Sequence, residues 1–227
     1  MFQASRWEAA RFPGPAAATS ILMTRPRVLL TGFEPFGSFK VNPSWAALKL
    51  AQADGLLQKN ARFLLAEIPV DYARAFSVFD KAARMFKPQV AVSFGVHGGL
   101  EGRELATIYI ERIARNRDQA AKPDNAGQVR GRQAIIANAP KSLRTRYVLR
   151  GLRSRLSSAG FEAKFSGNAG GYLCNHLFFR AAWAYQDRFP CLFVHVPPVA
   201  GGRGVIRIES LAKAVGLIAQ HAANQAQ

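Results

Sequence analysis

The stretch RVLLTGFEPFG at residues 27–37 indicates the fold class of the chain. Its apolar run at 28–30 predicts a buried strand that ends at the turn Thr31-Gly32. A helix is then expected to open at Pro43, because proline is well tolerated in the first helical turn. A strand followed by a loop and a helix is typical of an α/β protein.

The same alternation recurs toward the C-terminus. Short apolar runs predict strands at 63–65, 90–94, 105–113, 163–165 and 192–195. Apolar residues at helical spacing predict helices at 72–86, 144–159, 174–185 and 208–222. Because strands alternate with helices, we expect an α/β fold with a mostly parallel sheet that helices cover on both faces.

One domain accounts for most of the 227 residues. Residues 1–26 are rich in Ala, Pro and Arg and lack steady periodicity, so they are expected to form a flexible extension, with Met23 as an alternative start. Residues 27–227 are expected to form a single domain. The sequence contains no secretory h-region near its start and no apolar run long enough to cross a membrane.

Two cysteines, Cys174 and Cys191, are too few for a disulfide framework, and no CxxC pair is present for zinc. A reducing, cytoplasmic location is therefore expected. Cys174 follows Gly170-Gly171 and begins a predicted helix, where the helix dipole and free N–H groups favour a thiolate and could hold an oxyanion. From position alone, a nucleophile and a small buried side chain both remain open.

His195 ends an apolar strand, and active sites gather at the carboxyl ends of strands in open α/β sheets. A neutral imidazole there could deprotonate a thiol, although a structural histidine fits equally well. His97, in a Gly-rich loop at another strand end, is a competitor. His176 lies two residues from Cys174, and side chains at that spacing on a helix do not face each other.

Glu111 lies in an otherwise apolar strand, where a carboxylate is costly unless it is paired. Arg112 is a poor partner, because adjacent strand residues point to opposite faces. A histidine partner fits better, and a Cys-His-carboxylate arrangement follows the general logic of catalytic triads.

Phe33 and Phe36 lie in the Gly-bounded loop that follows the first strand. Two aromatic rings at a strand end could form the walls of a flat apolar pocket, or they could anchor the loop in the core. The loop has neither the GxxxxGK[ST] nor the GxGxxG pattern, so we do not expect it to bind phosphate.

Several blocks of this sequence, taken in order, resemble the pyroglutamyl peptidase I family, also called the pyrrolidone-carboxylate peptidases. The similarity runs from about Arg27 to about Ala223. The matching blocks are LTGFEPFG at 30–37 with Asn42-Pro43, ERIA at 111–114 with Asn116, PDN at 123–125, GGYLCNH at 170–176 and VHVP at 194–197. Each block alone is a weak signal, whereas all of them in this order are specific.

The resemblance implies a cysteine peptidase that removes N-terminal pyroglutamate from peptides through a thioacyl-enzyme. It implies a three-layer α/β/α sandwich, a homodimer or homotetramer, and no cofactor or metal. The family's catalytic residues fall on Glu111, Cys174 and His195. The residues expected to contact the substrate are Phe33, Phe36, Leu173 and Val96.

Two departures from the family pattern bear on substrate preference. Val96 stands where many bacterial members have a glutamine, in a loop that reads Gly-Val-His-Gly-Gly. Many members also have an arginine near the oxyanion, shortly before the PDN block, and this chain reads Ala120-Ala121-Lys122 there. A cysteine hydrolase of the same fold that acts on another small amide or lactam therefore remains an alternative.

The high positive charge is not explained by a peptidase. The formal net charge is +17 and the isoelectric point is near 10.9. Residues 130–155 hold eight Lys or Arg and no Asp or Glu. Without a helix-turn-helix, RNP or zinc signature, we expect a solvated basic face and neither a nucleic acid nor a membrane as partner. A basic, nucleic-acid-associated homologue remains an alternative.

Overall fold

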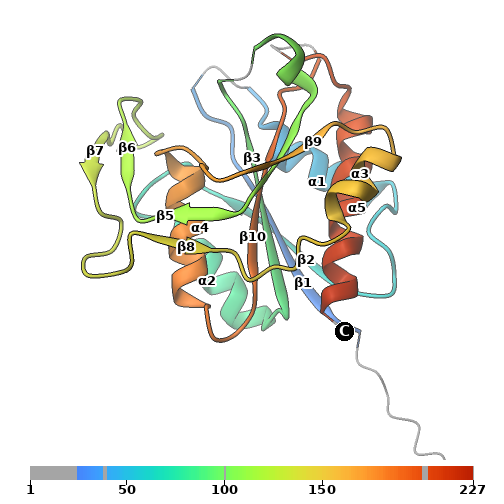
Figure 1. Cartoon of the computed structure of the whole chain (residues 1–227), viewed down its shortest axis with the longest axis horizontal. Helices are drawn as coiled ribbons and strands as arrows, with labels where there is room; N and C mark the ends of the chain where they lie inside the picture. Colours follow the sequence, from blue (N-terminus) through green and yellow to red (C-terminus); the bar gives the residue numbers. More distant parts are fainter. Residues whose placement is uncertain (1–24, 38–39, 100, 201–203, 227) are drawn as a thin grey trace, which may run out of the picture.

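The computed structural model describes residues 25–37, 40–99, 101–200 and 204–226, so the predicted extension lies outside it apart from residues 25–26. Its centre is a six-stranded sheet in the order β2-β1-β3-β10-β4-β9 (Figure 1). The strands are β1 (Arg27–Phe33), β2 (Arg62–Ile68), β3 (Val90–Val96), β4 (Ile108–Glu111), β9 (Ala163–Ser166) and β10 (Cys191–Val196). All its ladders are parallel except β10–β4, which confirms the prediction of a mostly parallel sheet.

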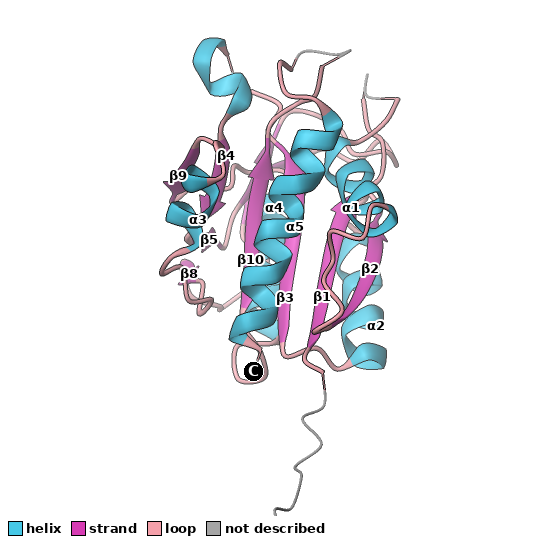
Figure 2. Cartoon of the chain, turned by 90° about the vertical axis from the view of Figure 1, so that its right-hand side faces the viewer, coloured by secondary structure: helices cyan, strands magenta, loops and turns pink. Residues whose placement is uncertain are grey.

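Helices lie on both sides of this sheet (Figure 2). They are α1 (Pro43–Ala53), α2 (Ala75–Phe86), α3 (Leu152–Ser158), α4 (Leu173–Ala184) and α5 (Ile208–Gln225). Helices α1, α3 and α5 share one core cluster with Leu30 and Val92, whereas α2 and α4 share the other with Leu29 and Ala91. Successive strand residues thus enter opposite cores, as the pleat requires. The three-layer α/β/α sandwich is confirmed.

The start of α1 lies where the sequence predicts it. Asn42 is the N-cap, and its side chain accepts a hydrogen bond from the backbone N–H of Ser44 at 3.1 Å, with Pro43 next in the chain. A Cβ on Gly32 would collide with the backbone of Ser44 and Trp45. The close approach of α1 to β1 therefore requires glycine at this position.

The prediction of a helix at 144–159 is wrong for its first half. Residues Ser142–Arg144 form strand β8, and α3 begins only at Leu152, after Gly151 at φ +80°. The hydroxyl of Thr145 accepts a hydrogen bond from the N–H of Tyr147 and donates to the carbonyl of Cys191. These local and long-range bonds compete with helix formation. Val148, which the helical pattern placed on the apolar face, is exposed.

The predicted strand at 105–113 is divided in the structure. Gly102–Ala106 form a 3₁₀ helix (η1), β4 covers Ile108–Glu111, and a separate strand β5 covers Ile113–Arg115. The division falls at Arg112, whose N–H donates to the carbonyl of Ser166 and whose own carbonyl accepts from Thr145. At Arg112 the chain passes from the central sheet to an antiparallel ladder with β8.

A second small ladder, which the sequence did not predict, pairs β6 (Asp118–Ala120) with β7 (Arg130–Gln133). It projects to one side of the central sheet (Figure 1). Within the described ranges, no helix has the length and apolarity needed to span a membrane.

Candidate active site

A cavity of about 540 Å³ lies where the carboxyl ends of β1, β3 and β10 meet the N-terminus of α4. Open α/β sheets bind ligands at this edge. Six of the residues expected to be functional line the cavity: Phe33, Phe36, Val96, Leu173, Cys174 and His195. The seventh, Glu111, lies behind His195 and does not line it. The fold thus brings all seven predicted site residues together.

Cys174 is the second residue of α4. The N-cap Tyr172 makes no side-chain capping bond, and the first intrahelical bond runs from the N–H of His176 to the carbonyl of Tyr172. The N–H groups of the first helical turn, including that of Cys174, therefore have no acceptor within the helix. A Cβ on Gly95 would lie 2.9 Å from the sulfur of Cys174, so glycine at this position in β3 leaves room for the thiol.

His195 and Glu111 are joined by a hydrogen bond across two antiparallel strands. In the β10–β4 register, His195 lies opposite Tyr109, and Phe193 lies opposite Glu111, so all four share one face of the sheet. Glu111 reaches diagonally across the ladder, which places its Oε1 2.8 Å from Nδ1 of His195. The carboxylate is 1% exposed, and Oε2 has no hydrogen-bond partner among the described residues.

The pKa of His195 is set by opposing effects. Burial lowers it, because the imidazolium is poorly solvated there, but Cys174 and Glu111 raise it through charge and hydrogen bonds. The result is a pKa of about 9, above the usual 6.5. Since Nδ1 faces Glu111, the nitrogen that faces Cys174 is Nε2. At neutral pH the ring is therefore an imidazolium. It can donate one hydrogen bond to Glu111 and one to Cys174.

Aromatic rings form one wall of the cavity. The ring centroids of Phe36 and Tyr172 are 6.2 Å apart, and the hydroxyl of Tyr172 donates to the carbonyl of Pro123 at 2.8 Å. Tyr172 was not among the residues predicted to line the pocket. The sequence offered one signal that Tyr172 lines the pocket, which is its position between Gly171 and the candidate nucleophile.

Lys122 also lines the cavity, and it is the single Lys or Arg among the described lining residues. Its Nζ lies 3.9 Å from the ring centroid of Phe36 and 5.6 Å from that of Tyr172. Burial lowers the pKa of Lys122, and the charge of Cys174 acts in the opposite direction. The lysine thus lies within electrostatic reach of the candidate nucleophile.

The two competing histidines occupy different places. His97 lines the cavity, with its ring centroid 5.1 Å from that of His195, and both burial and His195 lower its pKa. His176 is buried outside the cavity, with Nδ1 2.9 Å from Oδ2 of Asp118. Its side chain therefore faces away from Cys174, as the helical spacing predicts.

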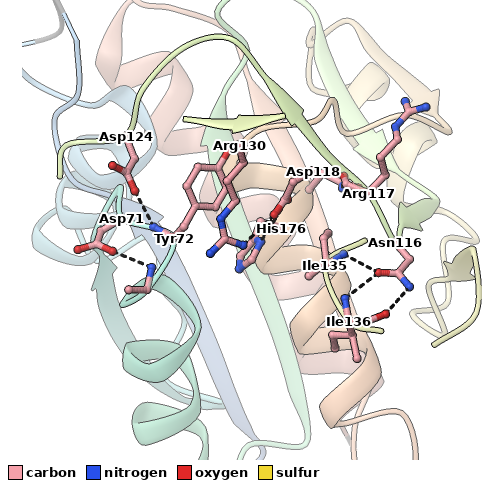
Figure 3. Close-up of polar contacts among 12 residues, drawn as sticks. Asp71, Tyr72, Asn116, Arg117, Asp118, Asp124, Arg130, Ile135, Ile136 and His176 are labelled. Atoms are coloured by element: carbon pink, nitrogen blue, oxygen red, sulfur yellow. Dashed lines mark hydrogen bonds and ion pairs between the residues drawn. The ribbon is translucent and has the colours of Figure 1, made fainter. Parts of the chain in front are cut away.

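Asp118 links the candidate nucleophile's helix to the cavity wall. Figure 3 shows its carboxylate beside His176 of α4 and Arg130 of β7, and it contacts both; Nη1 of Arg130 is 3.0 Å from Oδ2. The N–H of the next residue, Gln119, donates to the carbonyl of Gly171, where a Cβ would collide with the carbonyl oxygen of Gln119. This network positions the wall at 120–122 beside Cys174.

The chain is similar in sequence and structure to known peptidases. A family model described as pyroglutamyl peptidase matches residues 26–206. A pyrrolidone-carboxylate peptidase of Yersinia pestis (strain Pestoides F) is 33% identical over 174 residues, covering 75% of this chain and 78% of the relative. Pyroglutamyl peptidase I of Bacillus amyloliquefaciens superimposes with a TM-score of 0.80 at 27% identity, covering 88% of this chain and 96% of that one. For pyrrolidone carboxyl peptidase of Thermus thermophilus, the TM-score is 0.76 at 29% identity, with 86% and 99% covered.

Proposed function

The chain belongs to the pyroglutamyl peptidase family, and from this premise we propose that Cys174, His195 and Glu111 form its catalytic triad. Membership of that family makes it a cysteine peptidase that removes N-terminal pyroglutamate from peptides. One observation carries the triad: His195 lies between the buried carboxylate of Glu111 and the thiol of Cys174, at the cavity.

In the acylation step, the sulfur of Cys174 attacks the carbonyl carbon of the pyroglutamyl residue. A C–S bond forms, and negative charge moves onto the carbonyl oxygen, to which the free N–H groups at the start of α4 can donate. His195 is protonated because its pKa is raised, so it can give a proton to the leaving amine as the C–N bond breaks. The products are a thioester on Cys174 and the shortened peptide.

In the deacylation step, the now neutral His195 takes a proton from water while the water oxygen attacks the thioester carbon. The C–S bond breaks, pyroglutamate leaves, and the thiolate–imidazolium pair is restored. Glu111 holds the ring in one orientation and stabilises its positive charge in both steps.

The cavity suits a neutral lactam that has no free α-amine. Phe33, Phe36 and Leu173 provide apolar walls, and no carboxylate is present among the described lining residues. A substrate with an α-ammonium group would lose water there without gaining a counter-charge, and Lys122 would repel it. The lack of a carboxylate in the described lining, together with the shape of the cavity, should therefore disfavour substrates with an ordinary charged amino terminus.

We expect kcat/KM for a pyroglutamyl amide to exceed that for a prolyl amide by about 10²-fold or more, because the prolyl nitrogen carries a charge that the cavity leaves unpaired. Phe36→Ala should lower kcat/KM for the pyroglutamyl amide about tenfold, because a wall is removed. Release of a fluorophore from the two amides measures both effects. Phe86→Ala, outside the cavity, is the control. Comparable values for the two amides would favour a different small amide or lactam as substrate.

We further propose that Lys122 provides positive charge for the thiolate of Cys174 and for the developing oxyanion. Its Nζ is held against Phe36 and Tyr172 at the cavity, where partial burial strengthens its interaction with charges. The neighbouring residues at 120–121 are both alanine, so no other described side chain of this wall brings a cation into the cavity.

Replacing Lys122 by Met should lower kcat/KM about tenfold and slow alkylation of Cys174 by iodoacetamide at neutral pH, and added salt should shrink both differences. Lys122→Arg keeps the charge and should retain most of the activity and reactivity. Alkylation is read by mass spectrometry of the peptide that contains Cys174, so it reports the thiol without substrate turnover. An unchanged alkylation rate in Lys122→Met would contradict the role.

We also propose a cytoplasmic location, a homodimeric or homotetrameric assembly, and a single peptidase domain at 27–227. Two unpaired cysteines, one of them the proposed nucleophile, suit a reducing compartment. Both core clusters pack on the same central sheet, which supports one domain. Light scattering on the purified chain measures the assembly, and a monomeric mass would contradict it.

A further inference from the structure

Four arginines surround a hollow of about 370 Å³ beside the C-terminal end of β8, from which the chain continues to α3. They are Arg112, Arg144, Arg150 and Arg153, and no carboxylate lines this hollow among the described residues. The guanidinium carbons of Arg112 and Arg153 lie 5.7 and 5.5 Å from the ring centroid of Phe165. The phenyl ring thus provides a partly apolar support on which two of the charges are held.

A second hollow, of about 550 Å³, lies at the other end of the same ladder. Its positive residues are Arg115, Arg117, Arg132 and Lys141. The described part of its lining contains asparagine and glutamine but again no carboxylate. Eight of the 31 Lys and Arg of the chain therefore line these two hollows.

The β5–β8 ladder lies between the two hollows. Its register pairs Ile113 with Arg144 and Arg115 with Ser142. One hollow therefore lies at each end of a ladder of three residue pairs, which is about 10 Å long. In Figure 1 the segment that carries most of these charges runs from β7 through β8 to α3. We call the eight basic residues of the two hollows the basic face.

The basic face contacts a carbonyl and an aromatic ring but no carboxylate of the described residues: Arg115 donates from Nη2 to the carbonyl of Gly167 at 3.0 Å, and Arg112 and Arg153 lie over Phe165. None of the eight forms a salt bridge with any residue in the described ranges. The Nε atoms of Arg112 and Arg117, one in each hollow, are buried without a hydrogen-bond partner in the described structure. Clustered like charges destabilise a fold, and an anion in the hollows would offset their repulsion.

We propose that the basic face binds the phosphate backbone of a nucleic acid without regard to base sequence. Guanidinium groups donate pairs of hydrogen bonds to phosphate oxygens, and both hollows fall within one helical turn of about 34 Å. A net charge of +17 draws a polyanion toward the protein. The sequence favoured a solvated face because no helix-turn-helix, RNP or zinc signature accompanies the charge run at 130–155. The fold adds Arg112, Arg115 and Arg117 to that run.

Two other occupants fit the basic face less well. A second copy of the chain would bring the same arginines face to face across a two-fold axis, where like charges repel. An anionic membrane presents a flat surface, whereas the charges here lie around two recesses. A flexible row of phosphates can enter both recesses.

The test compares two double variants that remove the same charge. Arg144→Gln with Arg150→Gln removes two exposed arginines of the basic face. Arg62→Gln with Arg74→Gln removes two exposed arginines near the opposite edge of the sheet, on β2 and at the N-cap of α2. Anisotropy of a short fluorescein-labelled DNA duplex gives Kd over a range of salt concentrations for the full chain and each variant.

We expect the basic-face variant to bind about tenfold more weakly at low salt, and the slope of log Kd against log salt to fall by about 2, since each lost phosphate contact removes about 0.9. The control variant should change Kd less than about twofold. Arg132→Gln with Lys141→Gln, in the second hollow, should repeat the loss, so the test does not depend on one variant folding.

Equal weakening by both charge-matched variants would overturn the proposal, because it would show attraction to net charge alone. Tighter binding of phosphatidylserine vesicles than of DNA, with the same dependence on Arg144 and Arg150, would replace it with a membrane surface. Hydrolysis of the pyroglutamyl amide should stay within about twofold in every variant, because these residues lie outside the cavity of Cys174. A selective loss of hydrolysis would place the arginines in the peptidase site and also overturn the proposal.

Discussion

Cys174→Ser is expected to lower kcat for a pyroglutamyl amide by about 10⁴-fold or more, as removal of a catalytic nucleophile commonly does. The hydroxyl of serine is far less acidic than a thiol, so the charged pair with His195 would not form. The fold should survive, because the side chain lies at a cavity wall and the substitution leaves the volume nearly unchanged. Fluorophore release and circular dichroism on the same preparation measure the two effects.

Cys191→Ala is the matched control for the loss of a thiol. Cys191 lies in β10 within the apolar core, and burial raises its pKa to about 12, with Arg146 acting weakly in the opposite direction. A thiol that stays protonated and has no access to substrate cannot be the nucleophile. Most of the activity should remain, with a small loss of stability. Similar losses in both folded variants would remove Cys174 from its proposed role.

Glu111→Gln is expected to lower kcat by about 10²–10⁴-fold while changing KM little. The carboxylate accepts a hydrogen bond from Nδ1–H of His195 and helps to raise the pKa of that ring. A glutamine side chain can present its amide N–H to Nδ1, which would favour the wrong tautomer, and it carries no charge for the imidazolium. Single-turnover kinetics would place the loss in the chemical steps.

The dependence of activity on pH tests the same contact between Glu111 and His195, because the raised pKa fixes the direction in which activity should change. Because the pKa of His195 is raised to about 9, the ring remains protonated through neutral pH and loses its proton as the pH rises through about 9. Activity that needs an imidazolium should therefore fall above that pH. In Glu111→Gln the falling limb should move to lower pH, since one of the two groups that raise the pKa has lost its charge.

The stability of the folded chain should also depend on the protonation of His195. A pKa that is higher in the folded chain than the ordinary 6.5 stabilises the fold fully below about pH 6.5, and that contribution is lost as the pH rises toward 9. Tm of the native chain should fall over this window, and Glu111→Gln should flatten the fall. Glu104→Gln, which alters an exposed carboxylate that accepts from Tyr109, is the control. A pH profile unchanged by Glu111→Gln would contradict the orienting role.

Local sequence patterns correctly predicted the elements that depend only on residues close together in the chain. The apolar run of β1, the Asn42-Pro43 start of α1 and the glycine turn before α4 each act within a few residues, and all three lie where expected. The helix predicted at 144–159 was wrong because Ser142–Arg144 pair with β5, some thirty positions earlier in the chain. Helical spacing in a sequence carries no information about such a distant partner.

Residue type and position made Cys174, His195 and Glu111 candidates, and the order of the sequence blocks that resemble the family selected these three. Their contacts depend on how the strands are arranged. Glu111 meets His195, 84 positions away, because β4 runs antiparallel beside β10 and places the two side chains on one face. Lys122 comes near Cys174 because Asp118 and Gln119 attach its segment to α4. The basic face likewise exists because β5 pairs with β8 and joins arginines from separate segments, a pairing set by long-range packing and backbone hydrogen bonds.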